Sequence, residues 1–319
     1  MKNGIKYIII LAMPATIFTG CSSKNEWARV HSPDGQAAII VSSKDKHMIQ
    51  MPGPEPPRTL SRKARFLVEV KGKKVHDTGY KDVGVYQSIP NAFDIAWSPD
   101  SDHVAYRLIT TLRIVSRDGS VYQPDIICTN SLISSFKWVS NRELLVVVKE
   151  IDLPLNMYGY PQHYHGYLAK SKTIKIIRVN LDGRISERFI QNVNEPTFIF
   201  HSISFENQEI SPYSNQVAFS DGSSICIYDD IIGKVVAKAA IPGSLEGIWW
   251  DTKDRLILGL DLLSTSVRRF AIFDITDQKV YDCTATFLPL WDGLYKSVDW
   301  FRSGKTQQSG ATNVSPPHL

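Results

Sequence analysis

The chain has 319 residues, of which 43% are hydrophobic and 21% charged, and its formal net charge is +4. This length and apolar content suffice for one large β domain or two ordinary domains. No block of lysine and arginine interrupts the nearly balanced charge, which argues against a nucleic-acid-binding protein.

The first 20 residues have the pattern of a signal peptide. Lys2 and Lys6 supply a positive start, and residues 7–18 are apolar except for Thr16. This run is shorter than the roughly 20 residues that a membrane-spanning helix needs. We therefore expect residues 1–20 to be removed on secretion, which lowers the formal charge to +2 because two lysines are lost.

The segment that follows resembles a lipobox, the processing site of bacterial lipoproteins, because Cys21 comes directly after Phe-Thr-Gly. The resemblance implies that Cys21 becomes the mature N-terminus and carries a diacylglycerol and an amide-linked acyl chain. Several acyl chains give stable membrane attachment, whereas a single chain binds marginally. Since Ser22 rather than Asp follows, similarity to enteric sorting favours the periplasmic face of the outer membrane. The alternative is an ordinary secretory signal that contains a cysteine.

The remaining chain divides by composition. We expect a lipidated linker over residues 21–26, a β domain over residues 27–302 and a disordered tail over residues 303–319, which is mostly Gly, Ser, Thr, Gln and Pro.

Three cysteines remain if Cys21 carries lipid: Cys128, Cys226 and Cys283. An oxidising periplasm would permit one disulfide, which leaves an odd thiol. No CxxC pair is present, and the pattern favours buried free thiols.

Paired hairpins recur five times along the β domain. The first hairpin of each pair covers residues 28–41, 93–106, 136–148, 210–219 and 248–258, and the second covers 65–75, 112–122, 174–185, 225–236 and 270–281. Each hairpin is an apolar strand, a polar turn and a second apolar strand, as β-hairpins are. Asp118-Gly119 and Asp182-Gly183 are typical tight hairpin turns.

Two hairpins make four strands, which is one propeller blade. We align the units on the residue at or near the start of the first turn. The aligned residues are His31, Trp97, Trp138, Ile210 and Trp250, and the spacings between them are 66, 41, 72 and 40 residues. The short spacings match one blade of roughly 40–45 residues, and the long ones a blade with an insertion. A sixth match ends at Trp300, 50 residues further on.

We therefore predict an all-β protein, a β-propeller of four-stranded blades. Five blades result if the last strand closes the ring with the N-terminal unit, and six if a further blade is assembled from both ends. A β-sandwich is the competing fold, but it gives no reason for paired hairpins to recur in the same order.

The units resemble the TolB-like propeller repeats, which also occur in the propeller domains of prolyl oligopeptidase relatives. The similarity is carried by Trp97-Ser98-Pro99-Asp100 before Val-Ala-Tyr and by Ser32-Pro-Asp-Gly, while the third and fifth units depart from it. The resemblance implies an architecture rather than an activity, and it implies partners in the cell envelope. TolB itself is soluble and has an additional N-terminal domain.

No catalytic signature occurs in the chain. GxSxG, HExxH and a phosphate-binding glycine loop are all absent from the sequence, so we expect a non-catalytic protein without cofactor. The repeat-equivalent Trp97, Trp138, Trp250 and Trp300 are expected in the core rather than in a ligand cage.

The insertion over residues 153–170 is the candidate binding loop. It combines aromatic and imidazole side chains at six positions: Tyr158, Tyr160, His163, Tyr164, His165 and Tyr167. Tyrosine gives large contact area with a polar tip, as at interface hot spots. The alternative is a loop that packs against its own propeller. A metal site at the two histidines lacks further ligands, so none is predicted.

These features predict a lipid-anchored module of the bacterial envelope that binds a protein partner. The alternative is a propeller that binds a small ligand or a glycan, with or without catalysis, on its central axial face.

Overall fold

The computed structural model describes residues 22–47, 59–82, 95–108, 111–124, 131–151, 169–197, 208–261 and 269–286. These residues form 21 β-strands, which confirms the all-β prediction. The signal peptide, Cys21, Trp300 and the tail lie outside the described residues.

The strands form five antiparallel sheets, each from four strands in chain order. Sheet 1 contains β1 (Ser22–His31), β2 (Ala37–His47), β3 (Thr59–Val70) and β4 (Lys73–Asp77), with the short β5 (Lys81–Asp82) also paired to β3. Sheet 2 contains β6 (Ile95–Trp97), β7 (His103–Leu108), β8 (Thr111–Ser116) and β9 (Val121–Tyr122). Sheet 3 contains β10 (Ser131–Trp138), β11 (Glu143–Ile151), β12 (Ala169–Asn180) and β13 (Ile185–Thr197). Sheet 4 contains β14 (Gln208–Ile210), β15 (Gln216–Ser220), β16 (Ser224–Asp229) and β17 (Lys234–Ala240). Sheet 5 contains β18 (Leu245–Thr252), β19 (Arg255–Leu260), β20 (Arg269–Asp274) and β21 (Lys279–Asp282).

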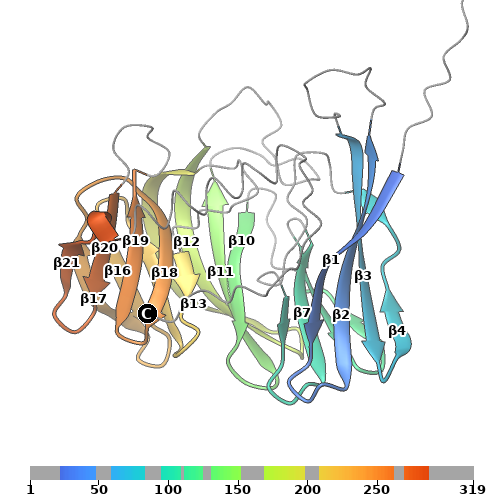
Figure 1. The fold of residues 1–319 in the computed structure, drawn as a ribbon. Helices are drawn as coiled ribbons and strands as arrows, with labels where there is room; N and C mark the ends of the chain where they lie inside the picture. The colour runs from blue at the N-terminus through green and yellow to red at the C-terminus, as the bar shows by residue number, and fades with distance from the viewer. Residues whose placement is uncertain are drawn as a thin grey trace, which may run out of the picture.

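The sheets stand side by side in chain order, from sheet 1 on the right of Figure 1 to sheet 5 on the left. First strands of neighbouring sheets contact one another, β6 with β10, β10 with β14, and β14 with β18. The fourth strands β17 and β21 also contact each other. This repeated arrangement of four-stranded antiparallel sheets is that of a β-propeller, and each sheet is one predicted pair of hairpins.

An apolar core fills each space between neighbouring sheets. Between sheets 1 and 2, for example, the rings of Phe66 and Tyr106 stack at a centroid distance of 4.3 Å. A sheet inside the stack is covered on both faces, so its strands carry apolar residues without alternation. Residues 144–148 of β11 follow this rule, since none of them is more than 4% exposed.

Three tryptophans at or near the ends of first strands join sheets 2, 3 and 5 to the sheets that precede them. The indole Nε1 of Trp97 donates a hydrogen bond to the carbonyl of Val30 (3.0 Å) and that of Trp138 to Ala96 (2.9 Å). Trp250 donates in the same way to Glu209 (3.3 Å). In each case the acceptor precedes the aligned residue of the preceding unit. The tryptophans that the repeat spacing aligned therefore make the same hydrogen bond to the preceding sheet.

The junction of sheets 3 and 4 uses a different donor, because the aligned residue there is Ile210. Lys137 replaces the indole: its Nζ donates to the carbonyls of Ser211 (2.9 Å), Pro212 (3.3 Å) and Ser214 (3.1 Å). Burial lowers the pKa of Lys137 below its usual range. A lysine that looks like an ordinary surface residue in the sequence thus stabilises an intersheet contact.

Short turns join the two strands of each hairpin. Ser32 Oγ accepts from the amide of Ala37 (2.9 Å) and donates to Asp34 Oδ1 (2.6 Å), and Ser98 and Asp100 repeat this bond at 2.6 Å. Gly119 has a φ of +89°, and a Cβ there would lie 2.5 Å from the carbonyl oxygen of Val75. The predicted turn at this glycine is confirmed, and glycine alone fits the close approach to sheet 1.

Two expected boundaries differ from the structure. Residues 22–26, which we expected in a linker, pair with β2 as the first half of β1, from Ser22 opposite Lys46 to Glu26 opposite Ser42. This half is polar and is ordered by its backbone ladder, so the sequence gives no apolar signal for a strand. Strand β12 likewise begins at Ala169, inside the segment assigned to the binding loop.

Candidate functional site at the loop end of the sheets

The two ends of the sheets differ. At one end, called the turn end, the first strand joins the second and the third joins the fourth by turns of at most five residues. At the other end, called the loop end, the second strand joins the third, and β1 starts there at Ser22. The turn end lies at the bottom of Figure 1. Two of the loop-end connections are long, with 11 residues between β2 and β3 and 17 between β11 and β12.

The candidate binding loop belongs to the loop end of sheet 3. Strands β11 and β12 are paired up to Ile151 opposite Ser171, so the connection leaves and re-enters on neighbouring strands. Its six candidate residues, Tyr158, Tyr160, His163, Tyr164, His165 and Tyr167, lie outside the described residues. Their role remains a prediction, but the strands that carry them are defined.

A polar cluster lies on β11 and β12, the two strands that flank this connection. Lys175 Nζ lies 2.6 Å from Glu150 Oε1, and Thr173 donates to the other oxygen of the same carboxylate. The ammonium of Lys175 and the hydroxyl of Thr173 hold the pKa of Glu150 below its usual range. Lys149 beside them is only 4% exposed. The base of the loop is therefore fixed by charge as well as by the β ladder.

A pocket of about 400 Å³ opens at the loop end between sheets 4 and 5. Its apolar walls are Ala240, Pro242, Leu260, Phe270, Ala271 and Val280, and its polar residues are Arg269 and Asp282. This volume falls within the range of small-molecule sites. No sequence pattern indicates this pocket, because its residues come from strands up to 42 positions apart.

Arg269 is held in place at this pocket by two neighbours. Its Nη2 donates to Asp261 Oδ2 and to the carbonyl of Pro242, both at 2.5 Å. Across the pocket, Asp282 accepts from the amide of Thr284 (2.8 Å), and this bond holds the pKa of the Asp282 carboxyl below its usual range. The pocket therefore offers an apolar surface with one fixed cation and one anionic carboxylate.

The first strands of sheets 3 and 4, β10 and β14, bear on the predicted alternative function, which is ligand binding on the central axial face of the propeller. Ser134 on β10 donates to Gln208 Oε1 on β14 at 2.7 Å. Gln208 is fully buried, and its Nε2 has no partner among the described residues. Across the described ranges, no three His, Cys, Asp or Glu side chains gather as they would to hold a metal.

The tryptophans expected in the core are found there where the structure describes them. Trp138 is 6% exposed and Trp250 9%, and Trp97 packs half-buried against the core of sheets 1 and 2. Their indole N–H groups are used in the intersheet bonds. They are therefore core residues, as predicted, and not a ligand cage.

Two of the cysteines are described, and neither of them forms a disulfide. Cys226 is buried, while Cys283 is half-buried and burial raises its pKa to about 11. A thiol with this pKa is almost fully protonated near neutral pH and is a poor nucleophile. Cys128 lies outside the described residues.

The strands account for almost all of the described chain, and no helix within these ranges is long and apolar enough to span a membrane.

No protein-family model matches the sequence, and no curated protein matches it either. Among solved structures, the chain is similar to an oligogalacturonate lyase in complex with manganese, at 13% identity and a TM-score of 0.43, over 83% of this chain and 74% of the lyase. It is similar to a Mycobacterium tuberculosis puromycin-hydrolysing peptidase at 15% identity and a TM-score of 0.43, over 81% of this chain but only 38% of the peptidase. A streptogramin B lyase aligns at 10% identity and a TM-score of 0.38, over 83% of this chain and 87% of the lyase. These similarities are too distant to assign a function, and the chain is described by its own architecture: five four-stranded antiparallel sheets in a β-propeller.

Proposed function

We propose that this protein is a lipid-anchored, non-catalytic module of the bacterial envelope that binds a protein partner at its loop end. One observation carries the proposal: the tyrosine-rich connection joins β11 and β12, two strands of sheet 3 that are paired as far as Ile151 opposite Ser171. Binding loops on a rigid scaffold are common, because the scaffold bears the cost of ordering their ends.

The proposed anchor is the acyl-bearing Cys21, which immediately precedes β1. The signal-like residues 1–20 and the lipobox-like sequence support it. An anchor at this position would leave almost no free chain between lipid and propeller, because Ser22 is already paired with Lys46.

A second candidate function is the binding of a small ligand, favoured by the pocket between sheets 4 and 5. Its apolar walls and its Arg269–Asp282 pair suit a compact molecule that carries polar groups at one side. A ligand search by thermal shift tests this function, with Ala240→Phe as the variant that narrows the pocket. A stabilising ligand whose effect is lost in the variant would favour it over the protein-binding function.

The protein-binding function is tested by crosslinking and capture from native envelope. Wild type is compared with a deletion of residues 154–168 and with a variant in which Tyr158, Tyr160, Tyr164 and Tyr167 are all serine. We expect both variants to stay folded and lipidated and to lose one specific protein partner.

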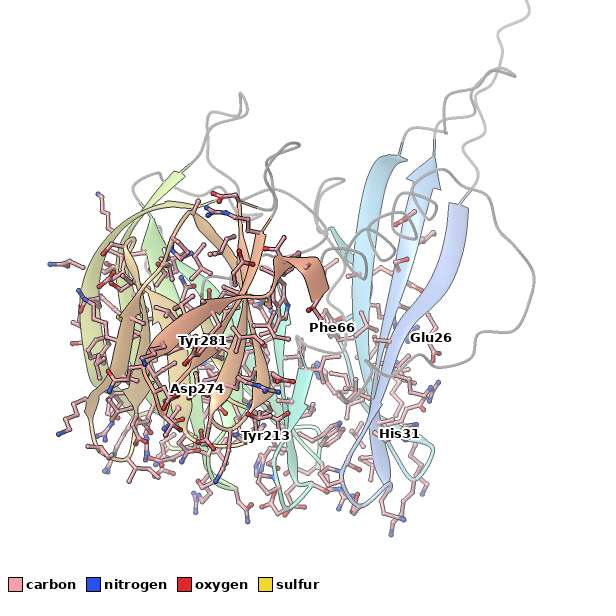
Figure 2. The ribbon with its side chains drawn as sticks, turned by 60° about the vertical axis from the view of Figure 1, so that its left-hand side comes forward. Glu26, His31, Phe66, Tyr213, Asp274 and Tyr281 are labelled. Carbon is pink, nitrogen blue, oxygen red and sulfur yellow. The ribbon has the colours of Figure 1, made fainter. Side chains whose placement is uncertain are left out.

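The matched control replaces two exposed tyrosines elsewhere, Tyr213→Ser and Tyr281→Ser. These side chains are 57% and 46% exposed and are labelled in Figure 2. The control should keep the partner. Loss in all variants alike, or in none of them, contradicts binding through the loop.

A further inference from the structure

The pocket between sheets 4 and 5 is the open end of an apolar core. Leu260 and Ala271 line the pocket and also belong to the core of these two sheets, and Val280 packs against that core. Toward the turn end the same space is filled by Leu258 and Phe273, which are fully buried. A cavity of about 400 Å³ continues this space at the loop end. A ligand that enters the pocket therefore meets an apolar floor.

The strand register places the two charged residues of the pocket on the same face of sheet 5 as this floor. Arg269 stands opposite Leu260, and Asp282 stands opposite Ala271. Arg269 and Ala271 share a face, and so do Val280 and Asp282, because side chains alternate along a strand. The face of sheet 5 toward sheet 4 thus carries an arginine and an aspartate beside apolar side chains.

The charge of Arg269 is balanced within the protein. Asp261 Oδ2 accepts from its Nε (3.2 Å) and its Nη2 (2.5 Å), and Asp261 Oδ1 accepts from the amide of Ser244 (3.1 Å). Gly243 packs directly against this pair, since a Cβ there would lie 2.5 Å from Arg269 Nη2 and 2.7 Å from Asp261 Oδ2. The Arg269–Asp261 pair is therefore a fixed and neutral part of the pocket wall.

Asp282, in contrast, brings a charge that is not balanced. No basic side chain of the described ranges lies within ion-pair distance of its carboxylate. Its Oδ1 accepts from the amide of Thr284 at 2.8 Å, whereas Oδ2 has no hydrogen-bond partner in the part of the chain that the structure describes. The bond from Thr284 lowers the pKa of Asp282, so the carboxylate is ionised at neutral pH. With one arginine against two aspartates, the site carries one net negative charge.

The position of Asp282, and not its charge alone, distinguishes it from other acidic residues of the sheet. Asp274 and Asp277 lie at the turn end, where Asp274 accepts from the amides of Thr276 (2.9 Å) and Asp277 (3.1 Å). Asp282 is the one acidic residue among those that line the pocket. Its carboxylate is therefore the group that a ligand on the apolar floor can reach.

We propose that this pocket binds an ammonium compound with an apolar body, whose cationic nitrogen donates to Asp282 Oδ2 and whose body lies on Leu260, Ala271 and Val280. The proposal rests on the second candidate function, small-ligand binding, and names the chemical class of the ligand. Ala271, directly opposite Asp282, has only a methyl group, which leaves room beside the carboxylate. The net negative charge attracts an ammonium group and repels a carboxylate.

The test compares probes that share an apolar body and differ in their head group: 2-phenylethylamine, 2-phenylethanol and phenylacetate. The full chain is purified from the envelope in lipid nanodiscs and titrated calorimetrically with each probe, and empty nanodiscs serve as the blank. We expect the amine to bind about fivefold more tightly than the alcohol, as one exposed ion pair allows. Phenylacetate should bind more weakly than both.

The variant Asp282→Asn keeps an oxygen for the Thr284 amide and removes the charge. It should weaken binding of the amine about fivefold and leave binding of the alcohol unchanged. The matched control is Asp277→Asn, which removes an exposed carboxylate from the same sheet at its turn end and should bind the amine as wild type does. Ala240→Phe narrows the pocket and should weaken the amine and the alcohol alike. Each variant is scored only after its thermal unfolding matches that of wild type.

The inference is overturned if the amine does not bind, if it binds no better than the alcohol, or if Asp282→Asn and Asp277→Asn weaken it equally. The small-ligand function is judged separately. Binding of the alcohol or of phenylacetate that Ala240→Phe weakens would leave that function standing and refute the ammonium class. Absence of any stabilising ligand in the thermal-shift search would refute the function itself.

Discussion

The turn end and the loop end of the same sheets are built on different principles. At the turn end, polar side chains are paired with one another or with backbone groups: Asp230 is fully buried yet bonded to Arg178 and Arg188, and Lys137 donates to three carbonyls. At the loop end, Lys175 and Arg269 are paired with Glu150 and Asp261, but Lys44 stands opposite Lys63 in the β2–β3 ladder and a pocket opens between sheets 4 and 5. The turn end joins neighbouring sheets to one another, and the loop end carries the long connections and the pocket.

The comparison can be tested because changes at the two ends should have opposite signatures. Turn-end changes should lower the free energy of unfolding without altering partner capture. Loop-end changes should alter binding and leave the free energy of unfolding almost unchanged.

The largest effect on stability is expected from Trp138→Ala. The change removes a side chain that is 6% exposed, leaves a cavity between sheets 2 and 3 and deletes the bond to Ala96. Buried tryptophan truncations cost about 3–5 kcal/mol. Urea unfolding should show this loss, and a loss below about 1 kcal/mol would contradict the role of the tryptophan in joining the sheets.

Asp230→Ala should cost somewhat less. Its carboxylate lies 2.6 Å from Arg178 and 3.3 Å from Arg188, and the change would leave both guanidinium groups without it. Breaking a buried pair costs about 3–5 kcal/mol, but both arginines are partly exposed, so we expect about 2 kcal/mol. Asp230→Asn is the control that keeps the shape, and a variant as stable as wild type would show that the cluster contributes nothing.

Lys44→Gln should slightly stabilise the protein, which is the reverse of the turn-end result. It removes one of two lysines that stand directly opposite each other, Lys44 on β2 and Lys63 on β3, and should raise the free energy of unfolding by roughly 0.2–1 kcal/mol. The gain should shrink as salt screens the repulsion. Equal stability of variant and wild type at low salt would show that Lys44 and Lys63 do not repel each other measurably.

The smallest effect is a pH dependence at the first turn. The hydroxyl of Ser32, the amide of Gln36 and the guanidinium of Arg117 lower the pKa of Asp34 to about 2. Because the folded pKa is below the unfolded value near 3.9, this contribution is complete above about pH 4 and is lost as the pH falls through 2. Ser32→Ala should move the Asp34 pKa upward in an NMR titration of the carboxyl carbon. An unchanged titration would contradict the role assigned to the serine.

The sequence predicted the turn end better than the loop end, and the reason is physical. Trp97, Trp138 and Trp250 occupy equivalent places in the repeat because each donates an indole hydrogen bond to the preceding sheet, so the sequence period follows a repeated packing contact. The strand over Ser22–Glu26 was missed because it is polar and depends on backbone pairing with β2. Lys137 was missed because its acceptors are carbonyls of another sheet.

The loop-end features depend on contacts that no local pattern encodes. Lys44 and Lys63 are brought opposite each other through strand register alone. The pocket residues come from four strands and the β17–β18 connection. Composition did identify the tyrosine-rich insertion, since aromatic rings in a polar connection are unusual whatever the fold.

The most direct test of the account is partner capture from native envelope with the tyrosine-to-serine variant at positions 158, 160, 164 and 167, scored together with its free energy of unfolding. We predict the loss of one specific protein partner with a change in stability of less than about 0.5 kcal/mol, as for surface substitutions. Retention of that partner by a variant of wild-type stability would contradict the claim that the loop end is the binding surface.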